Sequence, residues 1–240
     1  TYKVGMDGKL FTLNKQAKKA SGTCFGTDGI RYEVAGATKQ IIAYEMDGKQ
    51  SIIADSISGN DIVVAHNGNI YITSPDGIEK PSKLYLIKPG GKPIVVDAGL
   101  KFANGITLSP DQTQLYVTES ATHWVWVYQV LSDGMLANKQ RYGWLHMGGN
   151  DNNAWSDGLR CDTAGRIYVT TRLGVQVLDQ TGRVNAIIPI PEGQPSNLCF
   201  GGKDFDILYL TAGSRVYKRK MNVRGANTFE KPFKPAPPKL

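Results

Sequence analysis

One stretch of the chain decides the fold: Ala103-Asn-Gly-Ile-Thr-Leu-Ser-Pro-Asp-Gln-Thr-Gln-Leu-Tyr-Val-Thr118. It contains two short apolar runs separated by Ser-Pro-Asp-Gln, which are turn-forming residues. β-Branched and aromatic side chains dominate both runs, and this composition is typical of strands. The stretch therefore predicts two consecutive antiparallel strands joined by a tight turn.

The same two-run pattern occurs five times, with starts 39, 44, 53 and 39 residues apart. The first runs are Ser21–Phe25, Asn60–Val64, Asn104–Leu108, Asp157–Cys161 and Ser196–Phe200. The second runs are Ile30–Val34, Ile70–Thr73, Leu115–Thr118, Ile167–Thr170 and Leu208–Thr211. Most repeats continue with a third and a fourth apolar run, as in Gln40–Tyr44 and Gln50–Ala54. The fourth runs of the next two repeats are Pro93–Val96 and Gln140–Trp144. Four short strands every ~40–45 residues form the blade of a β-propeller, whereas a sandwich or a barrel has no such repeat.

The strand count bears on the number of blades. Tyr2–Val4 and Leu10–Leu13 match third and fourth strands of a blade, and the last repeat ends with a third strand, Arg215–Arg219. The total is three strands short of six complete blades. We predict an all-β, six-bladed propeller whose first blade lacks its two inner strands, which a segment ahead of Thr1 would supply. The alternative is a five-bladed ring in which the opening strands complete the last blade.

These patterns divide the chain into one propeller domain, residues 1–225, and a Pro- and Lys-rich tail, residues 226–240, that is either extended or a strap on the propeller. The formal charge of +7 lies at the two ends, around a body that totals −4. Nothing in the basic ends interleaves aromatic and base-reading residues, so we expect no nucleic-acid partner. No apolar stretch approaches the ~20 residues of a membrane span. The sequence leaves the compartment open between bacterial cytoplasm and periplasm or secretion.

Cysteine and histidine exclude other kinds of site. The three cysteines, Cys24, Cys161 and Cys199, lie far apart in apolar runs, so we expect buried free thiols and neither a disulfide framework nor a zinc site. The three histidines show no metal-ligand spacing, and no nucleophilic triad is evident.

A polar residue stands two positions before the first core residue of every repeat. These residues are Ser21, Asn60, Asn104, Asp157 and Ser196. Side chains at one register of the inner strands converge at one mouth of the propeller channel, and Asn and Asp oxygens are typical ligands of Ca²⁺. Taken singly, each residue is more often structural, forming a turn or capping a strand. Together they predict a ring of oxygen ligands around the axis.

Several motifs resemble the gluconolactonase / senescence-marker-protein (regucalcin) family. They are Ser58-Gly-Asn-Asp-Ile-Val-Val64, Ala103-Asn-Gly-Ile-Thr-Leu-Ser-Pro-Asp111, Ser156-Asp-Gly-Leu159, Thr171-Arg-Leu-Gly-Val-Gln-Val177 and Pro195-Ser-Asn-Leu-Cys-Phe-Gly-Gly202. The resemblance covers about residues 1 to 225. It implies a six-bladed propeller with one divalent metal at the channel mouth and the hydrolysis of sugar-acid lactones.

The resemblance also implies roles for individual residues. Asn104 and Asp157 match two metal ligands of the family, and Asn60 matches an asparagine that touches substrate or a metal-bound water. The third family ligand is a glutamate on an inner strand of the first blade, which would lie ahead of Thr1. We expect Ca²⁺, with Zn²⁺, Mg²⁺ or Mn²⁺ as alternatives, and we assign Ser21 and Ser196 to substrate binding.

The predicted function is a metal-dependent lactonase of the carboxylic-ester hydrolase class, acting on a small sugar lactone, provided that the upstream glutamate is present. Asp157 would hold the metal and take a proton from water. The alternatives are a metal-stabilised propeller that binds a ligand or a protein without turnover, and a module of a larger enzyme with a further upstream domain. The segment from His146 to Trp155, with Asn150 and Asp151, is either an irregular loop or a lid over the same mouth.

Overall fold

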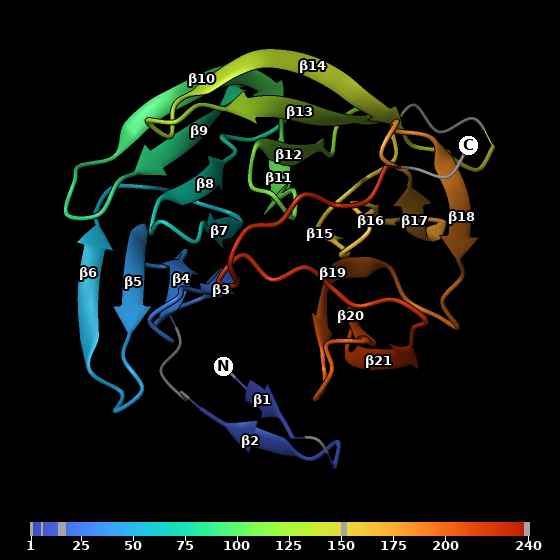
Figure 1. Cartoon of the computed structure of the whole chain (residues 1–240), viewed down its shortest axis with the longest axis horizontal. Coiled ribbons are helices and arrows are strands. Elements are labelled where there is room, and N and C mark those ends of the chain that lie inside the picture. The colour runs from blue at the N-terminus through green and yellow to red at the C-terminus, as the bar shows by residue number, and fades with distance from the viewer. Residues whose placement is uncertain (1, 6, 14–17, 150–152, 238–240) are drawn as a thin grey trace.

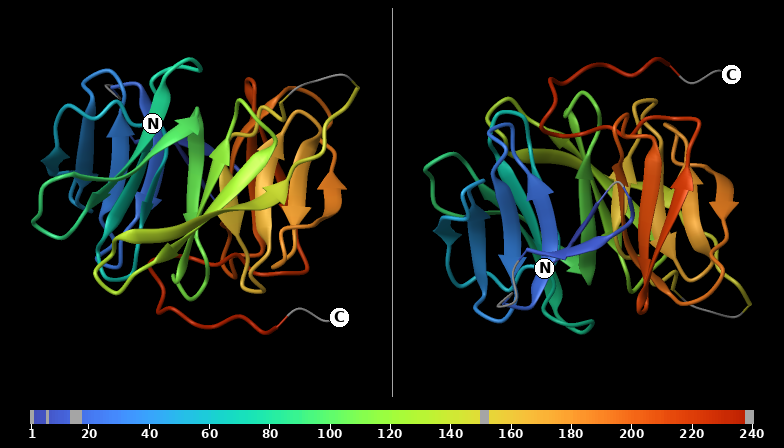
Figure 2. Two further views of the ribbon diagram at one scale, coloured as in Figure 1. Left: turned by 90° about the horizontal axis from the view of Figure 1, so that it is seen from above. Right: turned by 90° about the horizontal axis from the view of Figure 1, so that it is seen from below.

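The computed structural model describes residues 2–5, 7–13, 18–149 and 153–237, and their strands form six separate antiparallel sheets. Five of the sheets are arranged around a common axis as the blades of a propeller, seen down the axis in Figure 1 and from the edge in Figure 2. Blade 1 consists of β3 (Ala20–Phe25), β4 (Arg31–Ala35), β5 (Gln40–Tyr44) and β6 (Gln50–Ala54). Blade 2 consists of β7 (Ile62–Val64), β8 (Ile70–Ser74), β9 (Pro81–Ile87) and β10 (Ile94–Lys101).

The remaining blades follow in the same order along the chain. Blade 3 consists of β11 (Ala103–Leu108), β12 (Gln114–Glu119), β13 (Trp124–Val130) and β14 (Leu136–Trp144). Blade 4 consists of β15 (Leu159–Cys161), β16 (Ile167–Thr171), β17 (Gly174–Leu178) and β18 (Val184–Ile188). Blade 5 has three strands, β19 (Pro195–Gly201), β20 (Ile207–Ala212) and β21 (Arg215–Lys220). In each blade the first strand in the chain lies nearest the axis.

The opening strands form a sheet of their own. β1 (Tyr2–Val4) pairs with β2 (Leu10–Thr12), and this hairpin lies between blade 1 and blade 5 in Figure 1. It is not joined to β21, which is the edge of the three-stranded blade 5 in the part of the chain that the structure describes. The arrangement is that of an incomplete six-bladed propeller, as predicted, and the opening strands do not complete blade 5 as the five-bladed alternative requires.

Two outer strands are longer than the sequence predicts. The apolar run Pro93–Val96 continues as β10 to Lys101, and β14 begins at Leu136 ahead of the run Gln140–Trp144. Register shifts absorb the polar and glycine residues in these strands, for example between Val95 and Asp97. Bulges of this kind interrupt the alternation of apolar and polar residues, so a prediction based on that alternation makes the strand too short.

The hydrophobic core lies between neighbouring blades. Ile106 and Val117 of blade 3 are fully buried in one cluster with Tyr71 and Leu84 of blade 2. The Tyr71 hydroxyl donates a hydrogen bond of 2.8 Å to the backbone oxygen of Gly134 in blade 3, so the tyrosine joins two blades as well as filling space. No helix long and apolar enough to cross a membrane occurs among the described residues.

The cysteines only partly match expectation. Cys161 is buried and Cys24 is half-buried, but Cys199 is exposed, so the prediction of a buried thiol is wrong there. The reason is the two-residue period of β19. Leu198 and Phe200 point into the core, and Cys199 between them faces the opposite side of the sheet.

The end of the chain crosses one face of the disc and contacts four blades in turn (Figure 2). The Gly225 amide donates to Phe205 O of blade 5 (2.8 Å), and the Ala226 amide donates to Cys161 O of blade 4 (2.9 Å). Gln112 Nε2 of blade 3 donates to Thr228 O (2.8 Å), and His66 Nδ1 of blade 2 lies 3.1 Å from Phe229 O. The Phe233 amide then donates to Pro110 O of blade 3 (3.1 Å). We call residues 225–237 the strap. These contacts hold it over the end of the channel opposite the inner-strand starts.

Candidate functional site

A repeated hydrogen bond fixes the polar residues that precede the inner strands. The hydroxyls of Thr73, Thr118 and Thr170, each on the second strand of a blade, donate to a backbone oxygen of the next blade. The acceptors are Asn104 O (2.5 Å), Asp157 O (2.7 Å) and Ser196 O (3.2 Å). Each contact therefore sets the position of one candidate site residue relative to the preceding blade.

The same hydroxyls also organise their own blades. Thr73 Oγ1 accepts the Asp61 amide at 3.0 Å, and Thr118 Oγ1 accepts the Gly105 amide at 2.8 Å. The Asn60 amide also donates to Thr73 O (2.7 Å), and the Thr73 amide donates to Asp61 O (3.0 Å), so two residues of this strand face one residue of β8. This bulge explains why β7 begins at Ile62 and not at the predicted Asn60. At the ends of the row, the Gly22 amide donates to Asn60 O (2.7 Å) and the Gly158 amide donates to Ser196 O (2.9 Å). The five polar positions consequently follow one another around the axis.

Asn104 and Asp157 form the centre of the site. Asn104 is 7% exposed and donates from Nδ2 to Ser120 Oγ at 3.0 Å, while its Oδ1 is buried without a hydrogen-bond partner among the described residues. Ser156 Oγ, on the residue before Asp157, is likewise buried without a hydrogen-bond partner among the described residues. Buried acceptors are normally paired, so oxygens left without partners beside a carboxylate indicate a place for a ligand.

The Asp157 carboxyl lies in an environment that disfavours its charge. Burial, followed by the negative charge of Asp61, raises its pKa to about 7, against an opposing effect of the Asn104 amide and the Gly158 backbone. A cation bound by Asp157 and the Asn104 oxygen would relieve the repulsion between the two carboxylates. This donor chemistry fits a hard divalent cation, although no cluster of three His, Cys, Asp or Glu side chains occurs in the described ranges.

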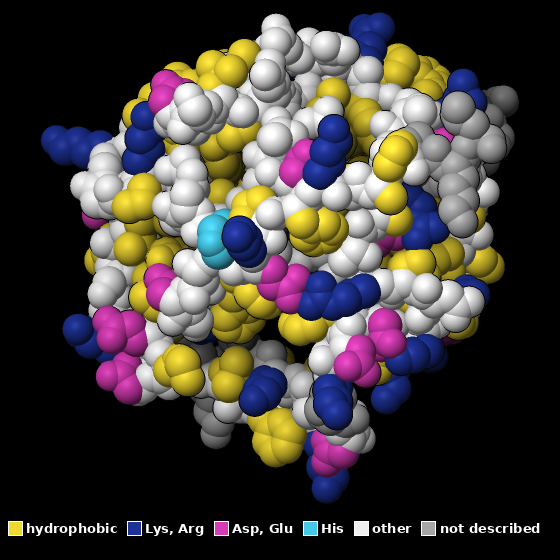
Figure 3. All heavy atoms as spheres, viewed as in Figure 1, with side chains coloured by type: hydrophobic (Ala, Val, Ile, Leu, Met, Phe, Trp, Pro, Cys, Tyr) yellow, Lys and Arg dark blue, Asp and Glu magenta, His cyan; other side chains and the backbone are white. Residues whose placement is uncertain are grey.

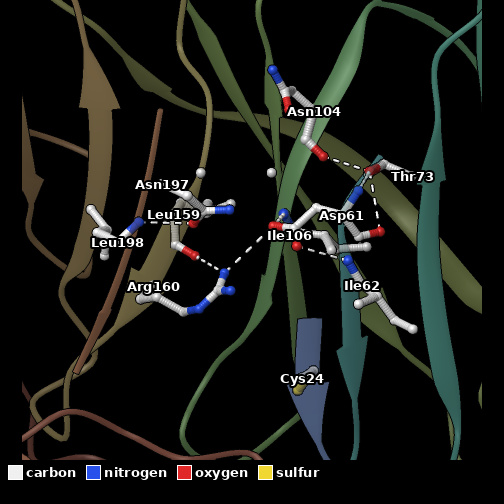
Figure 4. A network of polar contacts seen from close by, with 12 residues as sticks. Cys24, Asp61, Ile62, Thr73, Asn104, Ile106, Leu159, Arg160, Asn197 and Leu198 are labelled. Carbon is white, nitrogen blue, oxygen red and sulfur yellow. Dashed lines mark hydrogen bonds and ion pairs between the residues drawn. The ribbon is translucent and has the colours of Figure 1, made fainter. Parts of the chain in front are cut away.

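Sequence reasoning missed the polar pair in the middle of the channel, Asp61 and Arg160. Asp61 is 1% exposed, and its carboxylate accepts the amides of Ile62 (2.9 Å) and Ile106 (3.3 Å). Arg160 reaches it from blade 4, with 3.5 Å between Nη1 and Asp61 Oδ2 (Figure 4). One sequence signal could have pointed to Asp61: in two repeats a second polar residue follows the first, Asp61 after Asn60 and Asn197 after Ser196. Asn197 Oδ1 accepts the Leu198 amide at 2.8 Å, as Asp61 accepts the amide of Ile62.

The other predicted site residues, Asn60, Ser21 and Ser196, are more exposed than Asn104. Asn60 is half-buried, and Ser21 and Ser196 are exposed at the mouth. The Ser196 hydroxyl is paired with Thr211 Oγ1 at 2.9 Å within blade 5. No contact in the described part of the chain joins Ser21 or Asn60 side chains to Asp157, so their roles toward substrate stay predictions.

One aromatic side chain lies beside the blade 4 end of the mouth. Trp155 has a left-handed backbone, with φ of 47°, and its ring lies 5.0 Å from the Arg172 guanidinium carbon. Asn150 and Asp151, the other residues of the candidate lid, lie outside the described residues.

Comparisons with known proteins identify the family of the chain. Residues 16–214 match the family model described as SMP-30/Gluconolactonase/LRE-like region. A gluconolactonase of Zymomonas mobilis is 26% identical over 86% of this chain and 64% of its own length. Regucalcin of Danio rerio is 26% identical over 58% of this chain and 46% of its own length. The chain therefore spans about half to two thirds of the length of these relatives.

Solved structures show the same fold. A gluconolactonase from Xanthomonas campestris superposes with a TM-score of 0.76 at 22% identity, over 91% of this chain and 76% of that one. Regucalcin from Agrobacterium tumefaciens gives a TM-score of 0.63 at 14% identity, over 90% of this chain and 93% of that one.

Proposed function

Because the chain belongs to the SMP-30/gluconolactonase/LRE-like family, we propose that it hydrolyses sugar-acid lactones with the help of a divalent cation at the channel mouth. The observation that carries this proposal is the buried, unpartnered Oδ1 of Asn104 next to the crowded carboxylate of Asp157. Similarity to lactonases such as the Zymomonas mobilis enzyme supports the substrate class.

Asn104 and Asp157 would hold the cation, with Ca²⁺ as the first candidate. When bound, a divalent cation polarises the lactone carbonyl and lowers the pKa of a bound water. Ser120 orients the Asn104 amide through the bond to Nδ2, and this leaves Oδ1 to bind the cation. Asp157 would accept the proton of the attacking water, and Asn60 would hydrogen-bond a substrate hydroxyl from the neighbouring blade.

Ser21 and Ser196 lie exposed on either side of these residues and would contact the sugar hydroxyls. A lactone is uncharged and rich in hydroxyl groups, so a rim of serine and asparagine suits it better than a charged rim.

The test is hydrolysis of glucono-1,5-lactone above its spontaneous rate, with Ca²⁺ and after chelation. We expect cation-dependent turnover in the parent protein and a loss of at least 100-fold in Asp157→Asn. Asp47→Asn, in an exposed turn, is the matched control and should retain the parent rate. Equal rates with and without chelator, or an unimpaired Asp157→Asn variant, would refute the proposal. Cation binding without turnover would instead favour a binding propeller.

A further inference from the structure

The channel has a cavity at the end opposite the proposed lactone site. It has a volume of about 610 Å³ and is lined by the later residues of the inner strands, among them Cys24, Ile106, Arg160 and Cys199. The candidate lactone-site residues all precede those strands or stand at their starts, so the two sites lie on opposite sides of the Asp61–Arg160 pair. Figure 4 shows this order along the axis, from Asn104 through Asp61 and Arg160 to Cys24.

The strap borders this end of the channel. Its residues 226–229 line the cavity. Thr228 Oγ1 lies 3.7 Å from Cys24 Sγ, on the inner strand of blade 1. Figure 3 views this face of the molecule and shows hydrophobic side chains in the hollow beside the strap. The strap therefore forms part of the wall of this cavity.

A single charge lies in the lining. Arg160 is the only charged residue among the lining side chains. Its hydrogen bonds in the described part of the chain all leave from Nη1, to Leu159 O at 2.7 Å and to Asp61 Oδ2 at 3.5 Å. Nε and Nη2 remain available for a planar acceptor. Desolvation raises the pKa of Cys24, so this thiol stays neutral and does not compete for the guanidinium.

The walls around this charge are apolar. Four phenylalanines line the pocket together with Ile62, Val63 and Ile106; they are Phe25, Phe200, Phe205 and Phe229. The rings of Phe205 and Phe229 meet edge to face with centroids 6.1 Å apart, where the strap contacts blade 5. The volume lies within the ~300–1,000 Å³ range of small-molecule pockets, which combine apolar walls with a few polar groups.

We propose that this pocket binds a small organic monocarboxylate with an apolar, ring-bearing body. The carboxylate would take the planar, bidentate donors of Arg160, and the body would pack against the phenylalanines under the strap. Arg160 contacts Asp61 through Nη1 only, at 3.5 Å, so Nε and Nη2 can donate to a carboxylate, whereas a neutral ligand would leave these two donors without a charged acceptor. This site is independent of the lactone site and needs no metal.

The first experiment measures binding of 3-phenylpropanoate and of its neutral amide, 3-phenylpropanamide, by calorimetry on the metal-free protein. We expect the acid to bind at least 10-fold more tightly than the amide. The matched pair of variants is Asp61→Asn and Asp61→Asn/Arg160→Gln, which differ only in the guanidinium. The acid should bind Asp61→Asn at least as tightly as the parent, because Arg160 has lost its competing partner, and at least 10-fold more weakly to the double variant. If Asp61→Asn does not fold, the parent and the double variant are compared.

The second experiment places the ligand. Cys199 is exposed and lines the pocket, so its alkylation by iodoacetamide, followed by peptide mass spectrometry, should slow by at least threefold with saturating 3-phenylpropanoate. The variant Arg183→Gln, which removes an exposed arginine in blade 4, should bind and protect as the parent does. Equal affinity for acid and amide, undiminished binding by the double variant, or unprotected Cys199 would each overturn the proposal. None of these readouts depends on lactone hydrolysis, so a failure here leaves the proposed function standing.

Discussion

The hydroxyl of Thr118 lies 2.7 Å from the backbone oxygen of Asp157, across the boundary between blades 3 and 4. The same oxygen atom of Thr118 accepts the Gly105 amide at 2.8 Å, so one buried side chain joins two inner-strand starts. Asp157 is therefore held by its neighbour blade, and the site geometry depends on contacts between blades more than on any single sheet.

Replacing this hydroxyl tests that dependence. Thr118→Val keeps the side-chain shape but leaves the Gly105 amide and the Asp157 oxygen without their partner, which should lower the free energy of unfolding by about 1–3 kcal/mol. Lactone hydrolysis should fall as well, because the Asp157 backbone is released. Urea denaturation gives the stability. Thr12→Val on the exposed β2 is the control, and an equal effect of both substitutions would contradict the argument.

The buried oxygen of Asn104 gives a second prediction, one that needs no activity assay. In the parent protein, Ca²⁺ at 100 times its Kd should stabilise the fold by about 2.7 kcal/mol. Asn104→Leu has a similar volume and lacks Oδ1, so its Tm should no longer respond to Ca²⁺, while its metal-free stability stays within about 1 kcal/mol of the parent. Thermal scans with and without Ca²⁺ measure both effects. Asn185→Leu, an exposed control, should keep the response, and a persisting response in Asn104→Leu would exclude this ligand.

The blades and the register of their inner strands could be predicted from the sequence, because each repeat carries its own turn and strand chemistry. That register correctly placed Asn104 beside Asp157. Local patterns contain no information about partners across the ring. The pairing of Asp61 with Arg160 joins blades 2 and 4, and Asp61 in isolation resembles half of an Asn-Asp turn. Cys199 was misjudged for a related reason: its apolar neighbours describe the other face of the strand.

The Asp61–Arg160 pair yields a third prediction. Removing one partner of a buried ion pair leaves an uncompensated charge, so Asp61→Asn should cost about 3–5 kcal/mol of stability. Asp61→Asn/Arg160→Gln removes both charges and should recover more than half of that loss. A double-mutant cycle by urea denaturation of the parent, both single variants and the double variant measures the coupling. Strictly additive losses would show that the two charges do not stabilise each other.

A turn of blade 4 provides a prediction on pH. The Asp179 carboxylate accepts the Thr181 amide (2.8 Å) and hydroxyl (2.6 Å) and the Arg183 amide (3.0 Å). Although slight burial acts in the opposite direction, these hydrogen bonds lower its pKa from 3.8 to about 2. A carboxyl with a depressed pKa in the folded state stabilises the protein fully above its unfolded pKa, and this contribution is lost as the pH falls through the folded value.

Asp179→Asn should therefore be less stable than the parent by about 1 kcal/mol at pH 6, a modest value because the turn is solvent-screened. The difference should hold down to about pH 5 and shrink progressively below pH 4, as protons neutralise the parent carboxylate. Urea denaturation of both proteins between pH 7 and pH 3 gives the profile. Asp47→Asn, which loses a single backbone hydrogen bond in an exposed turn, serves as the control for charge removal. A difference that grows on acidification would mean that the Asp179 carboxylate does not stabilise the turn.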